Sequence, residues 1–438
     1  MRWQPWGLAL CIVTNGVWVA RAQDPPPQTP AFRPFPGSQP DPTITALVGR
    51  LDLEKYKATI KGLTQFGDRR QGTDRNRAAL DWIEAQLKSY GCTNTERVTY
   101  TYPSPEATDP EAAPRGAGAG GQRGGRGRGA GDQGPAGAPT GTETRRSREG
   151  GSSQFGQRTR TNVYQPDAPN AAPLDPRLRS LNAQPTTPGQ RQDVYCTKIG
   201  TTHPGEMYII GGHMDGHGWG EAANDDGSGT ALVMEVARVF SAADVQSERS
   251  IRFVLWNNEE TGLNGAWAYV NQRKNLQGRE DPAGSGKYPE PRWLGMIQHD
   301  MMMWDHGMPG PDGKVPAEQR READVNIEFQ STSKMADGAQ KLAWAFKAAS
   351  DKYATDYPAS VGPHMTNTDS TPFMNLVPAI SVRENERGMQ IGAGWDPNWH
   401  QPSDVFATYS DQDFRLGLNA AQTTLSAIAQ LTGATIKK

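Results

Sequence analysis

Histidine and acidic side chains recur in short clusters in the second half of the sequence, and most clusters directly follow an apolar run. The clusters are GGHMD at residues 211–215, NDDGSG at 224–229, NNEETGL at 257–263, HDM at 299–301 and WHQPSD at 399–404. Imidazoles and carboxylates without a thiolate suit zinc in a hydrolytic site, and manganese or cobalt less well. Each of these side chains alone is more typical of an exposed polar position, so the interpretation depends on all of them together.

A site with two metal ions has specific requirements that these residue types can meet. Two divalent ions about 3.5–4 Å apart need a carboxylate that bridges them and further nitrogen and oxygen ligands. Another carboxyl group must stay off the metal to accept a proton from water. The adjacent Glu259 and Glu260 can divide this work, one turned toward the metal and the other toward solvent.

The segments between the clusters alternate between strand-like and helix-like patterns. Apolar runs predict strands at residues 193–198, 207–212, 251–256, 293–298, 325–329 and 379–382, and amphipathic periodicity predicts helices at 227–243, 263–272, 334–352 and 411–431. This alternation indicates an α/β fold with a mostly parallel central sheet and helices on both faces, a three-layer sandwich. Ligands in such folds bind beyond the carboxyl ends of strands, so we expect the clusters to meet at one edge of the sheet.

The first part of the chain adds two helical patterns and one strand. Helical periodicity begins near Thr43. A second helix is predicted with Asp74 as its N-terminal cap and Gly91 at its end, and a strand-like run follows at residues 97–101.

The five clusters, in this order and after predicted strands, resemble the secreted dizinc exopeptidases, which include bacterial leucyl-type aminopeptidases and related carboxypeptidases. The resemblance covers residues from about 190 to 431 and, more weakly, the two early helices. It implies two zinc ions per chain. His213 and Asp300 would hold one, Glu260 and His400 would hold the other, and Asp225 would bridge both.

The resemblance also implies how protons are handled at the site. Glu259 would act as the general base and then as the acid that protonates the leaving amine. Asp215 would orient His213 through its other ring nitrogen. The peptide bond after Asp225 is usually cis in this family.

Two features depart from the family pattern or fit it loosely, and the role of Arg383 has two interpretations. Many members place Tyr before the last zinc histidine as an oxyanion donor, and this sequence has Trp399 there. The motif TDSTPF keeps an acid, Asp369, which would organise either the substrate pocket or a nearby loop. Arg383 would either grip a substrate carboxylate or pair with Glu384 or Glu386.

Several functions fit the same scaffold. The expected activity is removal of N-terminal residues from a peptide substrate, with a carboxypeptidase or dipeptidase as the alternative. Related carboxypeptidases often carry an inserted domain, and residues 103–192 are too rich in Gly, Arg and Pro to form one, which favours the aminopeptidase. A non-catalytic binding protein would be expected to lack a ligand or Glu259, and all are present.

The remaining segments predict how the chain is organised. Residues 1–22 have the pattern of a signal peptide, which predicts a secreted or periplasmic protein. Residues 23–42 form a Pro-rich leader, and 43–438 a single dizinc peptidase domain, interrupted by a low-complexity insertion at about 103–192.

Composition excludes some partners and leaves other questions open. The net charge of −2 argues against a protein that coats nucleic acid. The insertion contains a Gly/Arg tract typical of disordered nucleic-acid binders, but export makes a solvated insertion the expected reading. No later apolar run reaches 18 residues, so we expect no stable membrane anchor. The sequence does not set the oligomeric state, or whether Cys92 and Cys196 pair.

Overall fold

The computed structural model of the chain describes residues 39–103, 175–216, 219–307, 311–312, 314–363, 365, 368–384 and 396–437. The predicted signal peptide, nearly all of the Pro-rich leader and the Gly/Arg tract lie outside these ranges. The helices are α1 (Pro42–Val48), α2 (Leu53–Thr64), α3 (Asp74–Ser89), α5 (Pro176–Asn182), α6 (Gly227–Phe240), α7 (Asn264–Arg273), α8 (Ala336–Tyr353) and α9 (Asp411–Thr432), with a 3₁₀ turn η4 (Phe406–Thr408).

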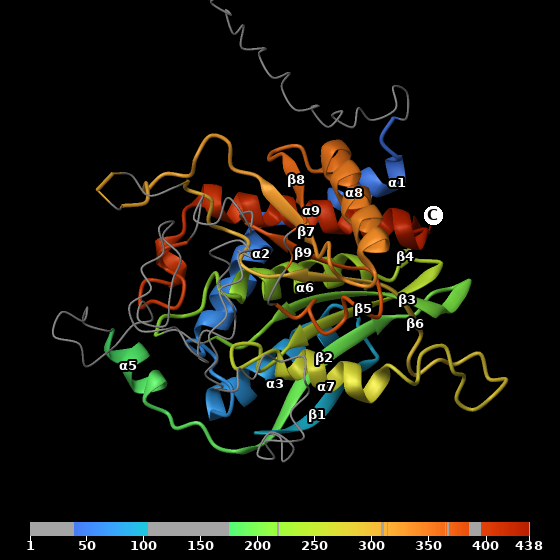
Figure 1. Cartoon of the computed structure of the whole chain (residues 1–438), viewed down its shortest axis with the longest axis horizontal. Helices are drawn as coiled ribbons and strands as arrows, with labels where there is room; N and C mark the ends of the chain where they lie inside the picture. The colour runs from blue at the N-terminus through green and yellow to red at the C-terminus, as the bar shows by residue number, and fades with distance from the viewer. Residues whose placement is uncertain are drawn as a thin grey trace, which may run out of the picture. The chain divides into compact units, whose positions relative to one another are not determined.

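An eight-stranded sheet forms the centre of the fold (Figure 1), with the strand order β1-β2-β5-β3-β6-β9-β7-β8. Its strands are β1 (Thr95–Tyr102), β2 (Gly189–Lys198), β3 (His203–His213), β5 (Arg249–Trp256), β6 (Arg292–His299), β7 (Val325–Phe329), β8 (Ala359–Gly362) and β9 (Ala379–Arg383). The central run β5-β3-β6-β9 is parallel, while β1, β2 and β7 pair antiparallel with a neighbour. The short strands β4 (Val245–Gln246) and β10 (Thr435–Ile436) form a separate pair.

Helices cover both faces of the sheet, as the sequence predicts. Neighbouring residues of the central strands belong to two separate buried clusters: Ile210, Phe253 and Ile297 to one, and Ile209, Val254 and Met296 to the other. Successive side chains of a strand point to opposite faces, so each cluster is the core of one face. The first includes side chains of α1, α2, α3, α6, α8 and α9, and the second includes those of α7.

The predicted elements are present, with corrections at their ends. Every strand and helix expected beyond residue 190 is found, and β8 is an additional strand. The cap of α3 is Thr73, whose hydroxyl accepts the Asn76 N–H (3.2 Å), so Asp74 is the first helical residue rather than the cap. Thr73 and Asp74 are both residue types that can cap a helix. A cap residue has a non-helical backbone, and the backbone of Thr73 is extended.

The predicted insertion ends earlier than expected, because α5 and the start of β2 belong to the folded body. Asn182 of α5 donates a hydrogen bond to the Trp219 carbonyl (2.9 Å), and Arg177 contacts Glu221 (3.2 Å). These contacts join residues far apart in the sequence, so local composition gives no sign of them. The part of the insertion at 104–174 lies outside the described residues.

Cys92 and Cys196 form a disulfide, which answers a question that the sequence left open. The bond joins the segment after α3 to β2, and its Cα atoms are 6.1 Å apart. Within the described part of the chain, no helix combines the length and apolar character that crossing a bilayer requires.

Candidate metal centre

The carboxyl ends of neighbouring parallel strands position the polar clusters at one edge of the sheet. His213 is the last residue of β3 and pairs in register with Trp256, the last residue of β5. On the other side of β3, Gly212 pairs with His299, so Asp300 is the first residue beyond β6. The loops that carry the candidate ligands therefore begin beside one another.

Asp226 ties three of these segments together through its carboxylate. It caps α6 by accepting a hydrogen bond from the Gly229 N–H (2.8 Å). It also accepts the N–H groups of His213 (3.0 Å) and Met301 (3.1 Å), at the end of β3 and just beyond β6. The peptide bond between Asp225 and Asp226 is cis, as the family resemblance implies.

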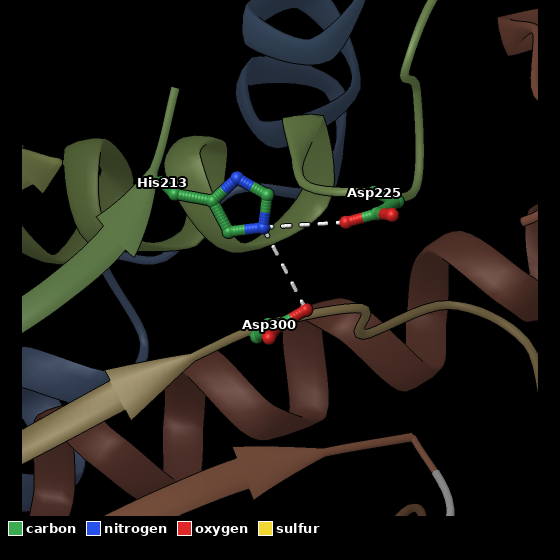
Figure 2. A group of neighbouring side chains, drawn as sticks. All are labelled: His213, Asp225 and Asp300. Carbon is green, nitrogen blue, oxygen red and sulfur yellow. Dashed lines mark ion pairs between the residues drawn. The ribbon is translucent and has the colours of Figure 1, made fainter. Parts of the chain in front are cut away.

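Asp225 lies between two histidines and turns one carboxylate oxygen toward each. His213 Nε2 is 3.2 Å from Oδ1, and His400 Nε2 is 3.0 Å from Oδ2. Beside His213 the second acid is Asp300 (Nε2–Oδ1 3.8 Å), and Figure 2 shows these three side chains directed toward one another. Beside His400 the second acid is Glu260 (3.1 Å).

These five side chains place their ligand atoms close enough together to hold metal. They form two buried groups that share Asp225, and the ligand atoms of each group lie within 4.8 Å of one another. Ligands 2.0–2.2 Å from a tetrahedral zinc ion are roughly 3.3–3.6 Å from each other. The nitrogen–oxygen distances here run from 3.0 to 3.8 Å, so the donor set fits the metal.

Asp215 contacts the other ring nitrogen of His213, and it does so through its main chain. Its main-chain carbonyl is 2.9 Å from His213 Nδ1, whereas its carboxylate is 3.9 Å away. A carbonyl only accepts, so Nδ1 donates, and in the neutral ring the Nε2 lone pair faces the acids. The carboxylate accepts the Glu259 N–H instead (3.1 Å), so Asp215 positions both residues.

Glu259 is buried next to the two groups. Together with His213 and Glu260 it forms a third set of ligand atoms within 4.8 Å of one another. Burial raises the pKa of Glu259 well above its ordinary value, and Glu260 adds to this while His213 opposes it. A carboxyl group that takes up a proton readily is suited to proton exchange with a water molecule.

The charges around the two histidines indicate that each of the two buried groups favours a cation. Burial disfavours protonation of His400, but Glu260 and Asp225 outweigh it and raise its pKa to about 10. Burial also opposes protonation of His213, and Asp225 and Asp300 raise its pKa well above the usual value. Each imidazole thus lies between carboxylates that stabilise positive charge.

Arg383 has partners that the sequence interpretation missed. It neither pairs with Glu384 nor reaches out to solvent. Its side chain is buried, with NH2 2.9 Å from Asp300 Oδ2 and Nε 3.7 Å from Glu328 Oε2. The other suggested partner, Glu386, lies outside the described residues. The arginine therefore contacts a candidate metal ligand directly, and no local sequence signal identified this pair.

A second acidic cluster supports the segment that leads to Asp225. Asp404 accepts the N–H groups of Asn224 (2.9 Å) and Asp225 (3.3 Å). Tyr409 OH lies 2.9 Å from Asp404 and 3.0 Å from Asp396. Burial and the charge of Asp396 raise the pKa of Asp404 to about 7.

Trp399 and Asp369 are both buried beside the site. The Trp399 ring stacks on His400, with ring centroids 3.9 Å apart, and packs against Met301. Asp369 accepts a hydrogen bond from Gln298 Nε2 (3.4 Å) near the end of β6. Trp399 thus helps to fix the imidazole, and Asp369 is anchored to a central strand rather than to a surface loop.

Left-handed backbone conformations of non-glycine residues also gather at the site. Ala222, Asn258, Met301 and His400 all have φ between 48° and 68°. Each such residue costs on the order of 1–2 kcal/mol. Strain of this kind persists where surrounding contacts over-determine the backbone, and it is common at functional sites.

The fold and the site together define a peptidase of the metal-dependent α/β type. The sequence profile of Peptidase family M28 matches residues 194–421, and the chain belongs to this family. It is 40% identical over 83 residues to leupeptin-inactivating enzyme 1 of Streptomyces exfoliatus (19% of this chain, 18% of that protein) and 33% identical over 79 residues to carboxypeptidase Q of Xenopus laevis (18% and 17%). The chain thus spans less than a fifth of the length of these two relatives.

Solved structures share the fold. The zinc aminopeptidase BSAP of Bacillus subtilis superposes with a TM-score of 0.55 at 15% sequence identity, over 89% of this chain and 96% of that one. At this identity the likeness concerns the fold, a mixed and mostly parallel eight-stranded sheet with helices.

Proposed function

We propose that the protein is a zinc-dependent exopeptidase that hydrolyses peptide bonds and removes residues from the amino terminus. The observation that carries the proposal is the position of Asp225, with one carboxylate oxygen facing His213 and the other facing His400. A shared carboxylate between two imidazole–acid groups is the arrangement that a pair of divalent ions needs.

The proposal assigns five ligands to two zinc ions per chain. His213 and Asp300 would hold one ion, Glu260 and His400 would hold the other, and Asp225 would be shared by both. Bound zinc supplies Lewis-acid chemistry, which makes water more acidic and polarises the scissile carbonyl. No protein nucleophile is required.

Glu259 is assigned the proton transfers. In this assignment it accepts a proton from the attacking water and then gives it to the leaving amine. The main-chain hydrogen bond to the Asp215 carboxylate (3.1 Å) holds the residue at the edge of the site, and burial raises its pKa. Asp215 also supports His213, so one residue aligns a ligand and the base.

The alternative is a carboxypeptidase or dipeptidase on the same scaffold. The similarity to carboxypeptidase Q supports this alternative. Such an enzyme needs a cationic group for the free carboxylate of its substrate. Arg383 was the sequence candidate, but it is buried against Asp300 and Glu328. Because Arg383 is not available to bind a substrate carboxylate, the aminopeptidase is favoured.

We also propose that the protein acts outside the cytoplasm, secreted or periplasmic. The disulfide between Cys92 and Cys196 supports this, because disulfides persist in oxidising compartments. The expected partner is a peptide substrate, and we expect no nucleic-acid partner.

The test combines two matched variants with a substrate panel. Glu259→Gln should retain zinc and lose activity by roughly 10²–10⁴-fold, the usual contribution of a general base. Glu260→Gln, one residue away, should lose zinc as well. Zinc content is measured by elemental analysis. Activity is measured on amino-acid anilides, N-blocked anilides, and dipeptides with either a free or a blocked carboxyl terminus.

Cleavage confined to substrates with a free amine supports an aminopeptidase. Cleavage that requires a free carboxylate would assign the alternative. A Glu259→Gln variant that turns over like the wild type, or that loses its zinc as Glu260→Gln does, would show that the general base has been misassigned.

A further inference from the structure

The two oxygens of Asp300 face different partners. Oδ1 is 3.8 Å from His213 Nε2, on the side of the proposed zinc ion. Oδ2 is 2.9 Å from Arg383 NH2, on the opposite side. The Asp300 N–H also donates to the Val382 carbonyl (3.3 Å), so the backbone of the ligand is tied to the strand that carries the arginine. One oxygen is thereby left for the metal.

The arginine is itself fixed from the neighbouring strand. Arg383 ends β9 and lies opposite Asn326 of the antiparallel strand β7. Glu328, two residues further along β7, has Oε2 3.7 Å from Arg383 Nε. A buried guanidinium between two carboxylates has little rotational freedom, so it defines the orientation of Asp300.

The second proposed zinc position lacks such a partner. Glu260, the acid that corresponds to Asp300 there, forms its ion pair with His400 and has no arginine or lysine partner among the residues that the structure describes. The two positions therefore differ in how their acid is held, although each combines one imidazole, one acid and the shared Asp225.

We propose that Arg383 is a positioning residue of the metal centre, which holds Asp300 so that only Oδ1 is offered to the zinc ion beside His213. This inference rests on the proposed zinc sites and goes beyond them by assigning a residue that controls one of the two. Without the guanidinium, the Asp300 carboxylate is free to turn about its side-chain bonds. The ion beside His213 is then bound less tightly, while the ion beside His400 keeps its ligands.

The positive charge of Arg383 also repels a metal ion bound to Asp300. Through this effect alone, removal of the arginine would strengthen metal binding. The geometric term dominates here, because hydrogen bonds that orient a metal ligand typically contribute 10–100-fold to metal affinity. The two effects have opposite signs, so measuring zinc affinity decides between them.

The experiment titrates metal-free protein with zinc and, separately, with cobalt(II), whose visible absorption reports the coordination of each ion. Wild type is compared with Arg383→Met and Arg383→Lys. Arg252→Met is the control, since Arg252 is equally buried, pairs with Glu290 (2.5 Å) and lies outside the proposed metal centre.

In Arg383→Met, one ion should bind as in wild type and the other 10–100-fold more weakly. Arg383→Lys, which keeps one N–H donor and the charge, should lose less. Arg252→Met should lower stability and leave both affinities unchanged.

Equal or tighter binding of both ions in Arg383→Met would overturn the inference. If that variant does not fold, Arg383→Lys decides, and wild-type affinity for both ions would overturn it. A wild-type protein that binds no zinc would instead overturn the proposed function.

Discussion

Removing the Asp226 carboxylate should destabilise the protein and disturb the metal centre together. Its oxygens accept three buried main-chain N–H groups, from His213 (3.0 Å), Gly229 (2.8 Å) and Met301 (3.1 Å). A buried donor without a partner costs about 1–3 kcal/mol. Three such donors give roughly 3–9 kcal/mol in Asp226→Ala, and local relaxation should limit the loss to about 4–5 kcal/mol, the upper range for single substitutions.

Asp226→Asn should remove only one of the three hydrogen bonds. Oδ1 accepts from Gly229 and Met301, and Oδ2 accepts from His213. An asparagine that keeps its oxygen in the first position turns its NH₂ group toward the His213 N–H, where two donors face each other. The loss of one bond should cost about 1–3 kcal/mol. It should also weaken zinc binding, because the backbone of a proposed ligand shifts.

The assay is urea unfolding followed by circular dichroism, with a chelator present so that bound metal does not contribute. Asp52→Ala is the matched control, because Asp52 caps α2 through a single N–H, that of Lys55 (3.0 Å). It should cost about 1 kcal/mol. Stability should fall in the order control, Asn variant, Ala variant. An Asp226→Ala protein as stable as the control would refute the reasoning.

Two further predictions concern stability. Replacing Cys92 and Cys196 together by alanine removes a covalent link between residues 104 positions apart. It should lower the free energy of unfolding by up to about 4.7 kcal/mol. Reductant should destabilise wild type and not the double variant, and an equal effect on both would contradict the disulfide. For Asp404, burial and the charge of Asp396 raise the pKa to about 7, so the folded state binds this proton more tightly than the unfolded chain. Its stabilising contribution is therefore full below about pH 4 and is lost as the pH rises through about 7. Melting of the chelated protein should show a shallower pH slope over this range in Asp404→Asn, and an unchanged slope would rule out this group.

Part of the candidate site could be predicted from local patterns and one topological rule, while the roles of individual ligands, His400 among them, came from the family resemblance. Apolar runs identify buried strands, and parallel strands bring their carboxyl ends to one edge. His213 and Asp300 follow directly from this rule, since β3 and β6 are neighbours in register. The sequence also places Asp225 in the turn that enters α6.

Other features could be decided only by tertiary structure. The partner of Arg383 depends on strand order and register, which set Asp300 on one side of it and Glu328 on the other. Nothing within its own segment distinguishes these acids from its sequence neighbour Glu384. The ordered helix α5 likewise depends on contacts with distant residues rather than on its composition.

The sequence by itself thus determined the kinds of ligand, their order and the edge of the sheet where they meet, because strand periodicity and residue chemistry are local properties. The tertiary structure decided how those ligands are held. The Asp215 carbonyl rather than its carboxylate meets His213, and Asp226 joins three segments. Such contacts depend on backbone direction and burial, since a hydrogen bond changes partner over a displacement of about 1 Å that no sequence pattern specifies.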